Sequence, residues 1–401
     1  MTAPQPPRVT PEEWPAIAFE SLEWSSRHAE RLAVDRFTSR PTRYEAAVPP
    51  FIAQRMLPLG SQVASLARAA ETDLIRFDAS LGSELSGFAP LLLRSEAAAS
   101  SQIEHLTASA RAILTAELGD TGKRNAAEIV GNTRAMQSAL DLANELTTDS
   151  VQAMHRVLLE GTNHTPGQWR GEPVWIGTSA RSPAGATFVA PAHERVPGLM
   201  EDLMVFARRD DLPVLTQIAV AHAQFETIHP FSDGNGRTGR ALVQAMLRGK
   251  DLTRAVTVPV SAGLLTDVSG YHEALTSYRR GDLEPIVRQF AEASADAISN
   301  SNVLIGELRE TAAAWANRAK PRPGSQLERV LSYAARQPVF TAGTLAAALA
   351  IAAPNVYPHL RKLAELGILK QKSEHKIGQV WRADDVLQAL DRFAERAGRR
   401  A

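Results

Sequence analysis

A twelve-residue segment over positions 229–240, HPFSDGNGRTGR, carries several groups that can act together on a phosphate-bearing substrate. His229 holds an imidazole, which accepts a proton near neutral pH. Asp233 offers a carboxylate oxygen to a hard cation such as Mg²⁺, which proteins commonly hold between a carboxylate and substrate phosphates. These two side chains predict a proton acceptor beside a metal-bound phosphate.

The rest of the segment provides an anion-binding turn and two cations. Gly234, Asn235 and Gly236 lie at the predicted start of a helix, where unpaired backbone N–H groups and the helix macrodipole attract anions. Arg237 and Arg240 are spaced to share one face of that helix. Two guanidinium groups beside such a turn fit a polyphosphate. The segment therefore predicts nucleotide phosphate chemistry with a hydroxyl group as acceptor.

Two predicted helices position this segment. The strongly apolar run LPVLTQIAVAHAQFETI precedes His229, and Pro230 follows it directly. A residue before proline is displaced from the α region, so we expect the first helix to end at His229. The run GRTGRALVQAMLRG is expected to form the second helix, because apolar residues recur behind its arginines.

Each feature has a more ordinary interpretation when taken alone. A DGNG stretch is usually a turn, a histidine at a helix end is usually structural, and two arginines at helical spacing usually face solvent. Their coincidence in one short segment favours a functional site. A rival interpretation is a metal site of His222, Glu226 and His229, which are spaced like ligands on one helix face. Pro230 argues against it, and the sequence offers no clear fourth ligand.

Composition excludes several other classes of function. The chain has 401 residues, of which 44% are hydrophobic and 22% charged, as in a globular protein of two or three domains. Lys+Arg and Asp+Glu number 44 each, so global charge implies neither a nucleic-acid nor a membrane partner. The absence of cysteine excludes disulfides, thiolate metal sites and a cysteine nucleophile. Without a signal peptide or an apolar run of membrane-spanning length, we expect a cytoplasmic protein.

Changes in the pattern of residue types along the chain indicate how it is organised. Apolar residues three and four apart predict helices from about residue 52 to 160 and again after 195. The runs VWIGTS and ATFVAP predict a β-hairpin over 174–190. The run NRAKPRPGS, at 317–325, predicts a linker. After it, three helical stretches and a β-like pair suggest a winged helix-turn-helix module, so the predicted fold class is mainly α.

The C-terminal module carries a local excess of basic residues. Between positions 355 and 382, six basic residues stand against Glu365 and Glu374. A basic second helix and wing fit DNA binding. Winged helices also bind proteins, and a basic run is often only a solvated surface, so the sequence leaves these alternatives open. The six residues are Arg361, Lys362, Lys370, Lys372, Lys376 and Arg382.

HPFSDGNGRTGR resembles the motif of the Fic family, which reads His-Pro-Phe, any residue, Asp or Glu, Gly-Asn-Gly-Arg, two residues, Arg. Every defined position matches. The runs YEAAVPPFI and SYRRGDLEPIVRQF are similar to the start of the family's N-terminal helical region and to its closing core helix, so the resemblance covers roughly residues 40–300. It implies a helical core with a flap, and transfer of AMP from ATP to a hydroxyl of a target protein, with Mg²⁺ bound and pyrophosphate released.

The resemblance also implies residue roles. His229 would be the general base on a Tyr, Thr or Ser hydroxyl, and Asp233 would hold Mg²⁺. The 174–190 hairpin would be the flap that pairs with a target segment. Gly236 matters because relatives that phosphorylate carry Lys there. The expected nucleotide site from the motif comprises Gly234, Asn235, Gly236, Arg237, Thr238, Gly239 and Arg240.

Upstream, SSQIEH resembles the inhibitory motif of many Fic proteins, in which Ser or Thr precedes Glu and the next residue is Gly or Asn. Ser100 and Glu104 match, whereas His105 departs from the pattern. Glu104 would pair with Arg240 where the γ-phosphate belongs. The alternative is a plain surface carboxylate.

The adenine pocket is less defined. The run SAGLLTDVSGYHEAL aligns loosely with a family segment that holds the base, and there Tyr271 would stack on adenine. An equally weighted alternative places Tyr271 in the helical core.

These interpretations define the expected domain limits and two classes of function. The limits are a polar leader at 1–40, an N-terminal helical region with the inhibitory helix at 41–120, the Fic core at 121–300, a helix and linker at 301–324, and the winged-helix-like domain at 325–401. The first function is an autoinhibited adenylyltransferase acting on a protein or on itself. The second is a DNA-binding regulator whose core senses nucleotide. The sequence leaves open whether the protein forms a homodimer.

Overall fold

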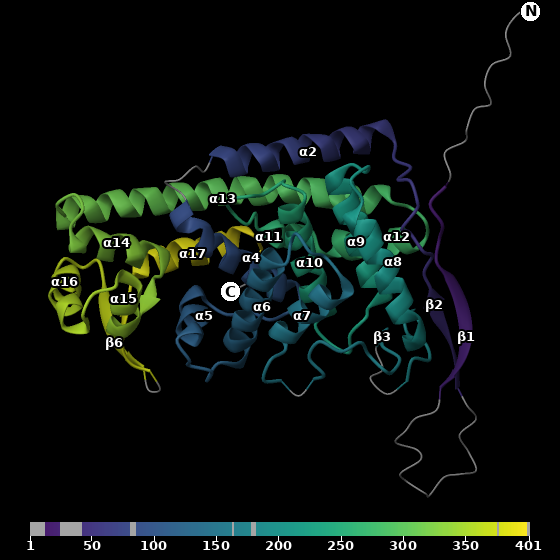
Figure 1. The fold of residues 1–401 in the computed structure, drawn as a ribbon, viewed down its shortest axis with the longest axis horizontal. Coiled ribbons are helices and arrows are strands. Elements are labelled where there is room, and N and C mark those ends of the chain that lie inside the picture. The colour runs from purple at the N-terminus through teal and green to yellow at the C-terminus, as the bar shows by residue number, and fades with distance from the viewer. Residues whose placement is uncertain are drawn as a thin grey trace, which may run out of the picture. The chain divides into compact units, whose positions relative to one another are not determined.

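The structure is a computed structural model that describes residues 13–24, 42–80, 86–162, 164–177, 182–374 and 377–398. These residues are mainly helical with small β elements, as predicted (Figure 1). The chain divides into two compact units. The first comprises Met1–Arg68, Trp169–Asn235 and Ser269–Gln289, and the second comprises Ala69–Gln168, Gly236–Val268 and Phe290–Ala401. Both units are discontinuous in sequence, and the domain limits drawn from the sequence stay predictions.

Two helices run from one unit into the other, namely α2 (Ser61–Ser80) and α13 (Glu284–Ala319). No helix within the described ranges is both long and apolar enough to cross a membrane.

The first unit combines two small antiparallel sheets with apolar helices. Its elements are β1 (Ala18–Trp24), β2 (Thr42–Val48), β3 (Trp175–Ile176), β4 (Phe188–Val189), the 3-10 helix η2 (His193–Arg195), α8 (Val196–Arg208), α9 (Val214–Ile228) and α12 (Val268–Arg279). β1 lies in the range expected to be a polar leader, most of which is outside the described residues. It pairs with β2 along its whole length, from Ala18↔Val48 to Trp24↔Thr42.

The predicted hairpin at 174–190 is confirmed by the antiparallel pairs Trp175↔Val189 and Ile176↔Phe188, although its tip at 178–181 is outside the described residues. Aromatic contacts anchor it within the first unit. Trp24 meets Trp175 edge-on with 5.4 Å between ring centroids, and the Arg279 guanidinium lies 3.8 Å from the Phe188 ring centroid. These contacts hold both strands of the hairpin against the β1–β2 sheet and α12.

The second unit is built from helices with a small sheet near its C-terminal end. Its elements are η1 (Ser86–Phe88), α4 (Ala89–Ile103), α5 (Ala110–Glu117), α6 (Arg124–Asp141), α7 (Thr148–Leu158), α10 (Asn235–Gly249), α11 (Val260–Leu264), η3 (Leu265–Asp267), α14 (Gln326–Arg336), β5 (Val339–Phe340), α15 (Ala342–Leu349), α16 (Ala353–Glu365), β6 (Lys370–Glu374), β7 (Gly378–Arg382) and α17 (Asp384–Arg396). Hydroxyl caps start several of these helices. Ser109 accepts the Ala112 N–H of α5, and Ser325 accepts the Glu328 N–H of α14.

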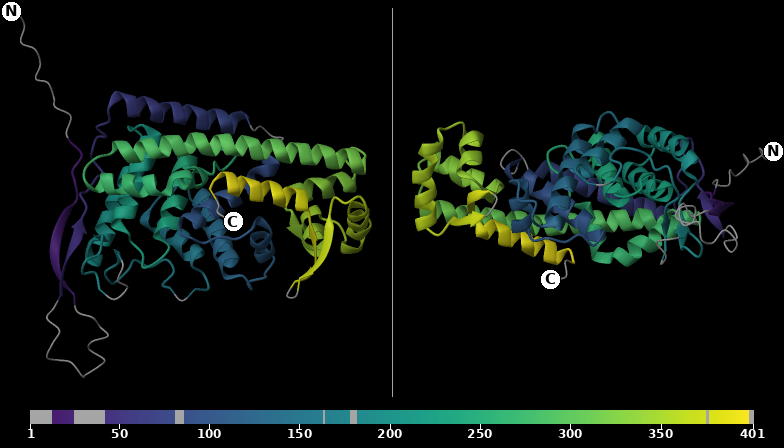
Figure 2. Two further views of the ribbon diagram at one scale, coloured as in Figure 1. Left: turned by 180° about the vertical axis from the view of Figure 1, so that it is seen from behind. Right: turned by 90° about the horizontal axis from the view of Figure 1, so that it is seen from below.

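The C-terminal module contains the predicted three helices followed by a β pair, as α14, α15, α16 and the β6–β7 hairpin (Figure 2). β5 adds a third strand, so the antiparallel sheet has the order β5-β7-β6. The helix α17 then follows. The predicted linker is short, because α13 continues to Ala319 and Ser325 already caps α14.

A buried carboxylate fixes a turn in the second unit. Asp78, which is 9% exposed, accepts the N–H groups of Arg254, Ala255 and Val256 at 2.9 to 3.0 Å. Its removal takes away the acceptor of three backbone donors.

We expect Asp78→Ala to lower the free energy of unfolding by about 2–4 kcal/mol, because three backbone donors lose a charged acceptor. Urea unfolding followed by circular dichroism measures this. The matched control is Asp73→Ala on the same helix, whose exposed carboxylate meets only Arg76 at 3.6 Å and should change stability by less than about 0.5 kcal/mol. Equal effects of the two variants would contradict the role of Asp78.

Candidate functional site

The helix α9 delivers His229 to the start of the motif. Every residue from Leu215 to Ile228 is buried, and the helix ends at Ile228 as Pro230 predicted. His229 adopts the left-handed conformation, with φ 50° and ψ 61°, while its N–H still donates to Phe225 O at 2.9 Å. This backbone geometry turns the imidazole away from the helical register.

The side chain of Asn235 closes the loop that follows. Its Nδ2 donates to Phe231 O at 2.8 Å, and its Oδ1 accepts the Phe231 N–H at 2.8 Å. Gly234 just before it has φ 74°, a conformation that glycine adopts without strain. The amide of Asn235 is therefore a structural lock, and only its backbone N–H is left to face an anion at the start of α10.

Arg170 is a buried residue beside the motif that the sequence interpretation missed. It is 4% exposed, and its Nε donates to His229 O at 2.8 Å. Its other nitrogens donate to Glu172 O at 3.0 Å, Pro191 O at 2.6 Å and Ile228 O at 3.4 Å. Its peptide N–H donates to Pro230 O at 3.0 Å. One guanidinium therefore holds the backbone on which the imidazole is mounted.

Burial lowers the pKa of the Arg170 guanidinium to about 10, so the group stays charged at neutral pH. A charged donor strengthens hydrogen bonds to carbonyl oxygens. The sequence shows only an arginine between a tryptophan and a β-rich run, because its acceptors come from segments far along the chain.

Arg240, on α10, is held by α4 within the second unit. Its side chain is 2% exposed. The Nε donates to Ser100 Oγ at 2.9 Å, and Nη2 donates to Ser100 O and to Glu104 Oε1, both at 2.8 Å. The structure thus brings together Arg240, Ser100 and Glu104, as the resemblance implied.

The carboxylate of Glu104 also lies against the first turn of α10. A Cβ placed on Gly236 would collide with Glu104 Oε1 and would come within 2.9 Å of Arg240 Nη1. Only glycine leaves room for an anion at this point of the helix. A carboxylate therefore stands at a helix N-terminus that favours anions.

His105, which departs from the inhibitory motif, adopts the geometry that Gly or Asn would take. Its φ is 61°, directly after the end of α4, and its N–H donates to Gln102 O at 2.9 Å. Histidine tolerates this left-handed conformation at a modest cost. His105 therefore replaces the Gly or Asn of the motif without requiring a different backbone conformation.

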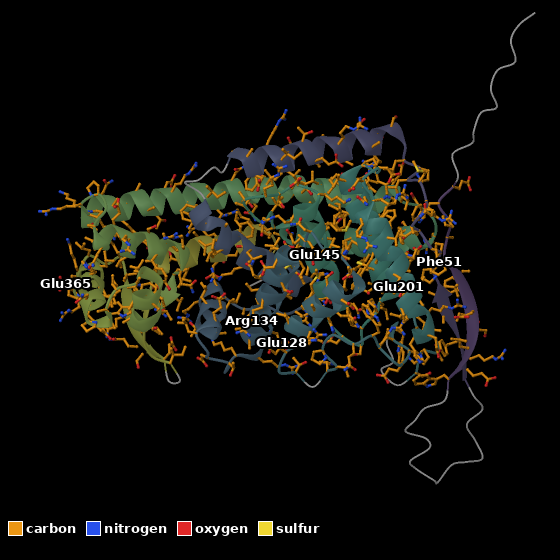
Figure 3. All side chains as sticks on the ribbon, viewed as in Figure 1. Phe51, Glu128, Arg134, Glu145, Glu201 and Glu365 are labelled. Carbon is orange, nitrogen blue, oxygen red and sulfur yellow. The ribbon has the colours of Figure 1, made fainter. Side chains whose placement is uncertain are left out.

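The other motif positions differ in exposure. Asp233 is half-buried, whereas Thr238 and Gly239 are buried in α10. Arg237 is buried, and its Nη1 lies 3.8 Å from Oε2 of Glu128, a residue of α6 that Figure 3 labels. A carboxylate such as Asp233 suits Mg²⁺, which keeps water and phosphate oxygens as its remaining ligands.

Tyr271 is 2% exposed, and its hydroxyl lies 2.7 Å from Nε2 of His222. This contact supports the core interpretation of Tyr271 rather than stacking on a base. It also bears on the rival metal site, because His222 is engaged with Tyr271 and His229 has left the helical register. Among the described residues, no group of three His, Cys, Asp or Glu side chains is arranged to hold a metal.

A second carboxylate of α4 is buried near Arg240. Glu96 is 1% exposed, and it accepts Ser261 Oγ at 2.6 Å and the Ser261 N–H at 2.9 Å. Burial raises the pKa of Glu96 to about 7, against the opposing effects of the Ser261 hydrogen bonds and the charge of Arg240. Glu96, Ser100 and Glu104 are spaced by four residues, so they share one face of α4.

Part of the chain is similar to known proteins. A family model described as Fic/DOC family matches residues 145–247, which include the whole motif. The protein adenylyltransferase fic-1 of Caenorhabditis briggsae is 28% identical over 221 residues, covering 49% of this chain and 40% of that protein. The protein adenylyltransferase Fic of Drosophila willistoni is 30% identical over 193 residues, covering 47% of this chain and 36% of that protein. The chain thus spans less than half the length of these relatives.

The fold has a match among solved structures. A Fic family protein from Desulfovibrio desulfuricans G20 aligns with a TM-score of 0.52 at 23% identity, covering 82% of this chain and 98% of that one. At this level of identity the match supports the fold.

The buried Glu96 predicts a pH dependence of stability. Above its ordinary pKa of 4.5 the unfolded chain loses this proton, whereas the folded protein keeps it up to about pH 7. Protonated Glu96 therefore contributes fully to the free energy of unfolding below pH 4.5. This contribution, about 3 kcal/mol, is lost as the pH rises from 4.5 through 7. Urea unfolding from pH 4.5 to 8 should show this fall in wild type and a flatter profile in Glu96→Gln. Exposed Glu145→Gln is the control and should match wild type. A wild-type profile parallel to that of Glu96→Gln would contradict the assignment.

Proposed function

Because the chain contains a Fic/DOC family domain, we propose that this protein is a protein adenylyltransferase that moves AMP from ATP to a Tyr, Thr or Ser hydroxyl of a target protein. We infer that Glu104 inhibits the reaction until it is displaced. The relatives named protein adenylyltransferase support the reaction class. Self-modification is included, since the acceptor is any hydroxyl that reaches the site.

The observation that carries the proposal is the position of the Glu104 carboxylate. It sits on Arg240 and against Gly236, at the first turn of α10. The site therefore already holds an anion where the proposal puts the outer phosphates of ATP. A carboxylate and a phosphate cannot both use the same guanidinium donors.

The chemical step follows from the same residues. The imidazole of His229 accepts the proton of the target hydroxyl as its oxygen attacks the α-phosphorus. The new bond joins that oxygen to phosphorus, and the bond from phosphorus to the bridging oxygen breaks, so pyrophosphate leaves with the bonding electrons. Arg237 and Arg240 balance the charge of the outer phosphates, and the Gly236 N–H donates to them.

Asp233 is the residue that would hold Mg²⁺, with the remaining ligands from phosphate and water. When bound, Mg²⁺ compensates phosphate charge in the ground and transition states. The 174–190 hairpin is proposed to align the target by strand addition, which its anchored position and the exposed side chain of Ile176 support.

A second candidate function rests on the C-terminal module. Its order of helices and hairpin supports a winged-helix assignment, and Arg361, Lys362, Lys370 and Lys372 are exposed on α16 and β6. Of the six basic residues noted in the sequence, Arg382 is buried and Lys376 is outside the described residues. A DNA-binding regulator with a nucleotide-sensing core would need these exposed cations but not the imidazole of His229.

His229→Ala should abolish AMP transfer, by about 10²–10⁴-fold, while ATP binding stays within about twofold. Incubation with labelled ATP and cell lysate measures transfer, and titration calorimetry measures binding. Unchanged transfer by His229→Ala would contradict the role of His229 as the base.

Excess chelator or Asp233→Ala should also stop AMP transfer, by leaving phosphate charge uncompensated.

Glu104→Gly should raise AMP transfer by about 10²-fold, because phosphates misplaced by about 1 Å regain in-line geometry. Nucleotide affinity should change less than the rate. Glu104→Gln isolates the charge, and Glu145→Gly is the matched control at an exposed glutamate. Adding His229→Ala should return activity to background. A rate within about twofold of wild type at saturating ATP would show that Glu104 is not the brake.

Arg170→Lys should lower kcat by about 10–100-fold and leave KM for ATP nearly unchanged, since it shifts the backbone under His229 but touches no phosphate. Lysine keeps the charge but cannot reach the same carbonyl oxygens. Exposed Arg195→Lys is the control. A rise in KM with unchanged kcat would contradict a positioning role for Arg170.

A further inference from the structure

A charged pocket lies within the second unit and is lined by residues of the helix α5 and of the β6–β7 hairpin. Its volume is about 420 Å³. It contains no residue of the 229–240 motif. Its charged lining comprises the cations Arg111, Lys123, Lys372 and Arg382 and the carboxylates of Asp120 and Glu374.

Arg382 distinguishes this pocket from an ordinary charged surface. Its side chain is 8% exposed, and it lines both this pocket and an adjoining hollow that Arg111 also lines. Its Nε makes no hydrogen bond to any described residue, and the nearest carboxylate oxygen, Asp384 Oδ1, is 3.5 Å away. A buried guanidinium donor without an acceptor is costly, so the pocket favours an entering acceptor.

The charge of the lining defines the acceptor. Four cations and two carboxylates leave an excess of two positive charges, which matches a phosphate group of nearly two negative charges. Arginine presents several donors to phosphate oxygens, and lysine adds a point charge. We propose that this pocket binds the phosphate group of a small anionic ligand through Arg111, Lys372 and Arg382.

The shape of the pocket favours a small ligand over a nucleic acid. Arg382 is buried and lines a concavity, whereas duplex phosphates lie on a convex surface. The exposed cations Arg361 and Lys362, on α16, are not part of the lining. They are the residues that a duplex would meet on the second helix of the module.

The helix α5, which lines the pocket, is joined to α4. Arg94 of α4 donates through Nε to Glu117 Oε1 at 2.7 Å and through Nη2 to Glu117 Oε2 at 2.9 Å, at the end of α5. Ligand bound between α5 and the hairpin stabilises this arrangement, and with it the contact of Glu104 on Arg240. This consequence rests on the proposed function and predicts that the ligand strengthens inhibition.

Pyrophosphate titrated calorimetrically without divalent cations tests the binding. Every protein in this titration is the whole chain with Arg237→Ala, a substitution that weakens phosphate binding at the motif. We expect Lys372→Ala and Arg111→Ala to weaken pyrophosphate binding by about tenfold or more, and exposed Lys362→Ala to leave it within about twofold. Circular dichroism checks that each variant is folded. Absence of binding, or binding unchanged by Lys372→Ala and Arg111→Ala, overturns the proposal. The proposal is also overturned if these variants lose binding to duplex DNA and pyrophosphate binds to none of the proteins.

AMP transfer tests the link to inhibition. Pyrophosphate should inhibit wild type more strongly than Lys372→Ala, because competition at the motif, which Lys372 does not line, is common to both proteins. Equal inhibition of the two proteins overturns the link. If no protein transfers AMP, even with Glu104→Gly, the proposed function fails while the calorimetric result on the pocket still decides the binding.

Discussion

The burial of Arg240 is the constraint on which the arrangement of α4 and α10 depends. A guanidinium that is 2% exposed needs acceptors, and α4 supplies them through the Ser100 hydroxyl, the Ser100 carbonyl and the Glu104 carboxylate. Removing one partner of such a pair leaves a buried charge uncompensated. The position of α4 is therefore tied to that of Arg240.

A second buried arginine does comparable work in the first unit. Arg170 satisfies its donors with carbonyl oxygens only, so it holds backbone rather than another side chain. Asn235 adds a reciprocal amide contact with Phe231 one turn later. The backbone around His229 is thus fixed by internal hydrogen bonds, which limits the freedom of the side chains that it carries.

The sequence predicted the parts of the site that depend on local rules. Pro230 predicted where α9 ends, and the glycines predicted an unusual turn before α10, because both effects act between neighbours in the chain. The pairing of Glu104 with Arg240 followed from a motif rather than from local physics. Tyr271 was left undecided, since only its partner His222 reveals that it belongs to the core.

What the sequence missed depends on partners distant in the chain. The strand β1 has little signal of its own and is defined by pairing with β2. Arg170 reaches acceptors up to 59 residues away, and no periodicity announces such contacts. Each compact unit is assembled from three separate segments of the chain, and the domain limits drawn from the sequence stay predictions.

The network around Arg94 ties α4 to the C-terminal module. Arg94, on α4, forms a two-point contact with Glu117 at 2.7 and 2.9 Å and donates to Gln337 Oε1 at 2.7 Å, just before β5. Proteins open locally in cooperative segments whose free energies lie below that of global unfolding. A local opening that detaches the C-terminal module removes an acceptor from Arg94. The packing of α4 therefore depends in part on a residue more than 200 positions away in the chain.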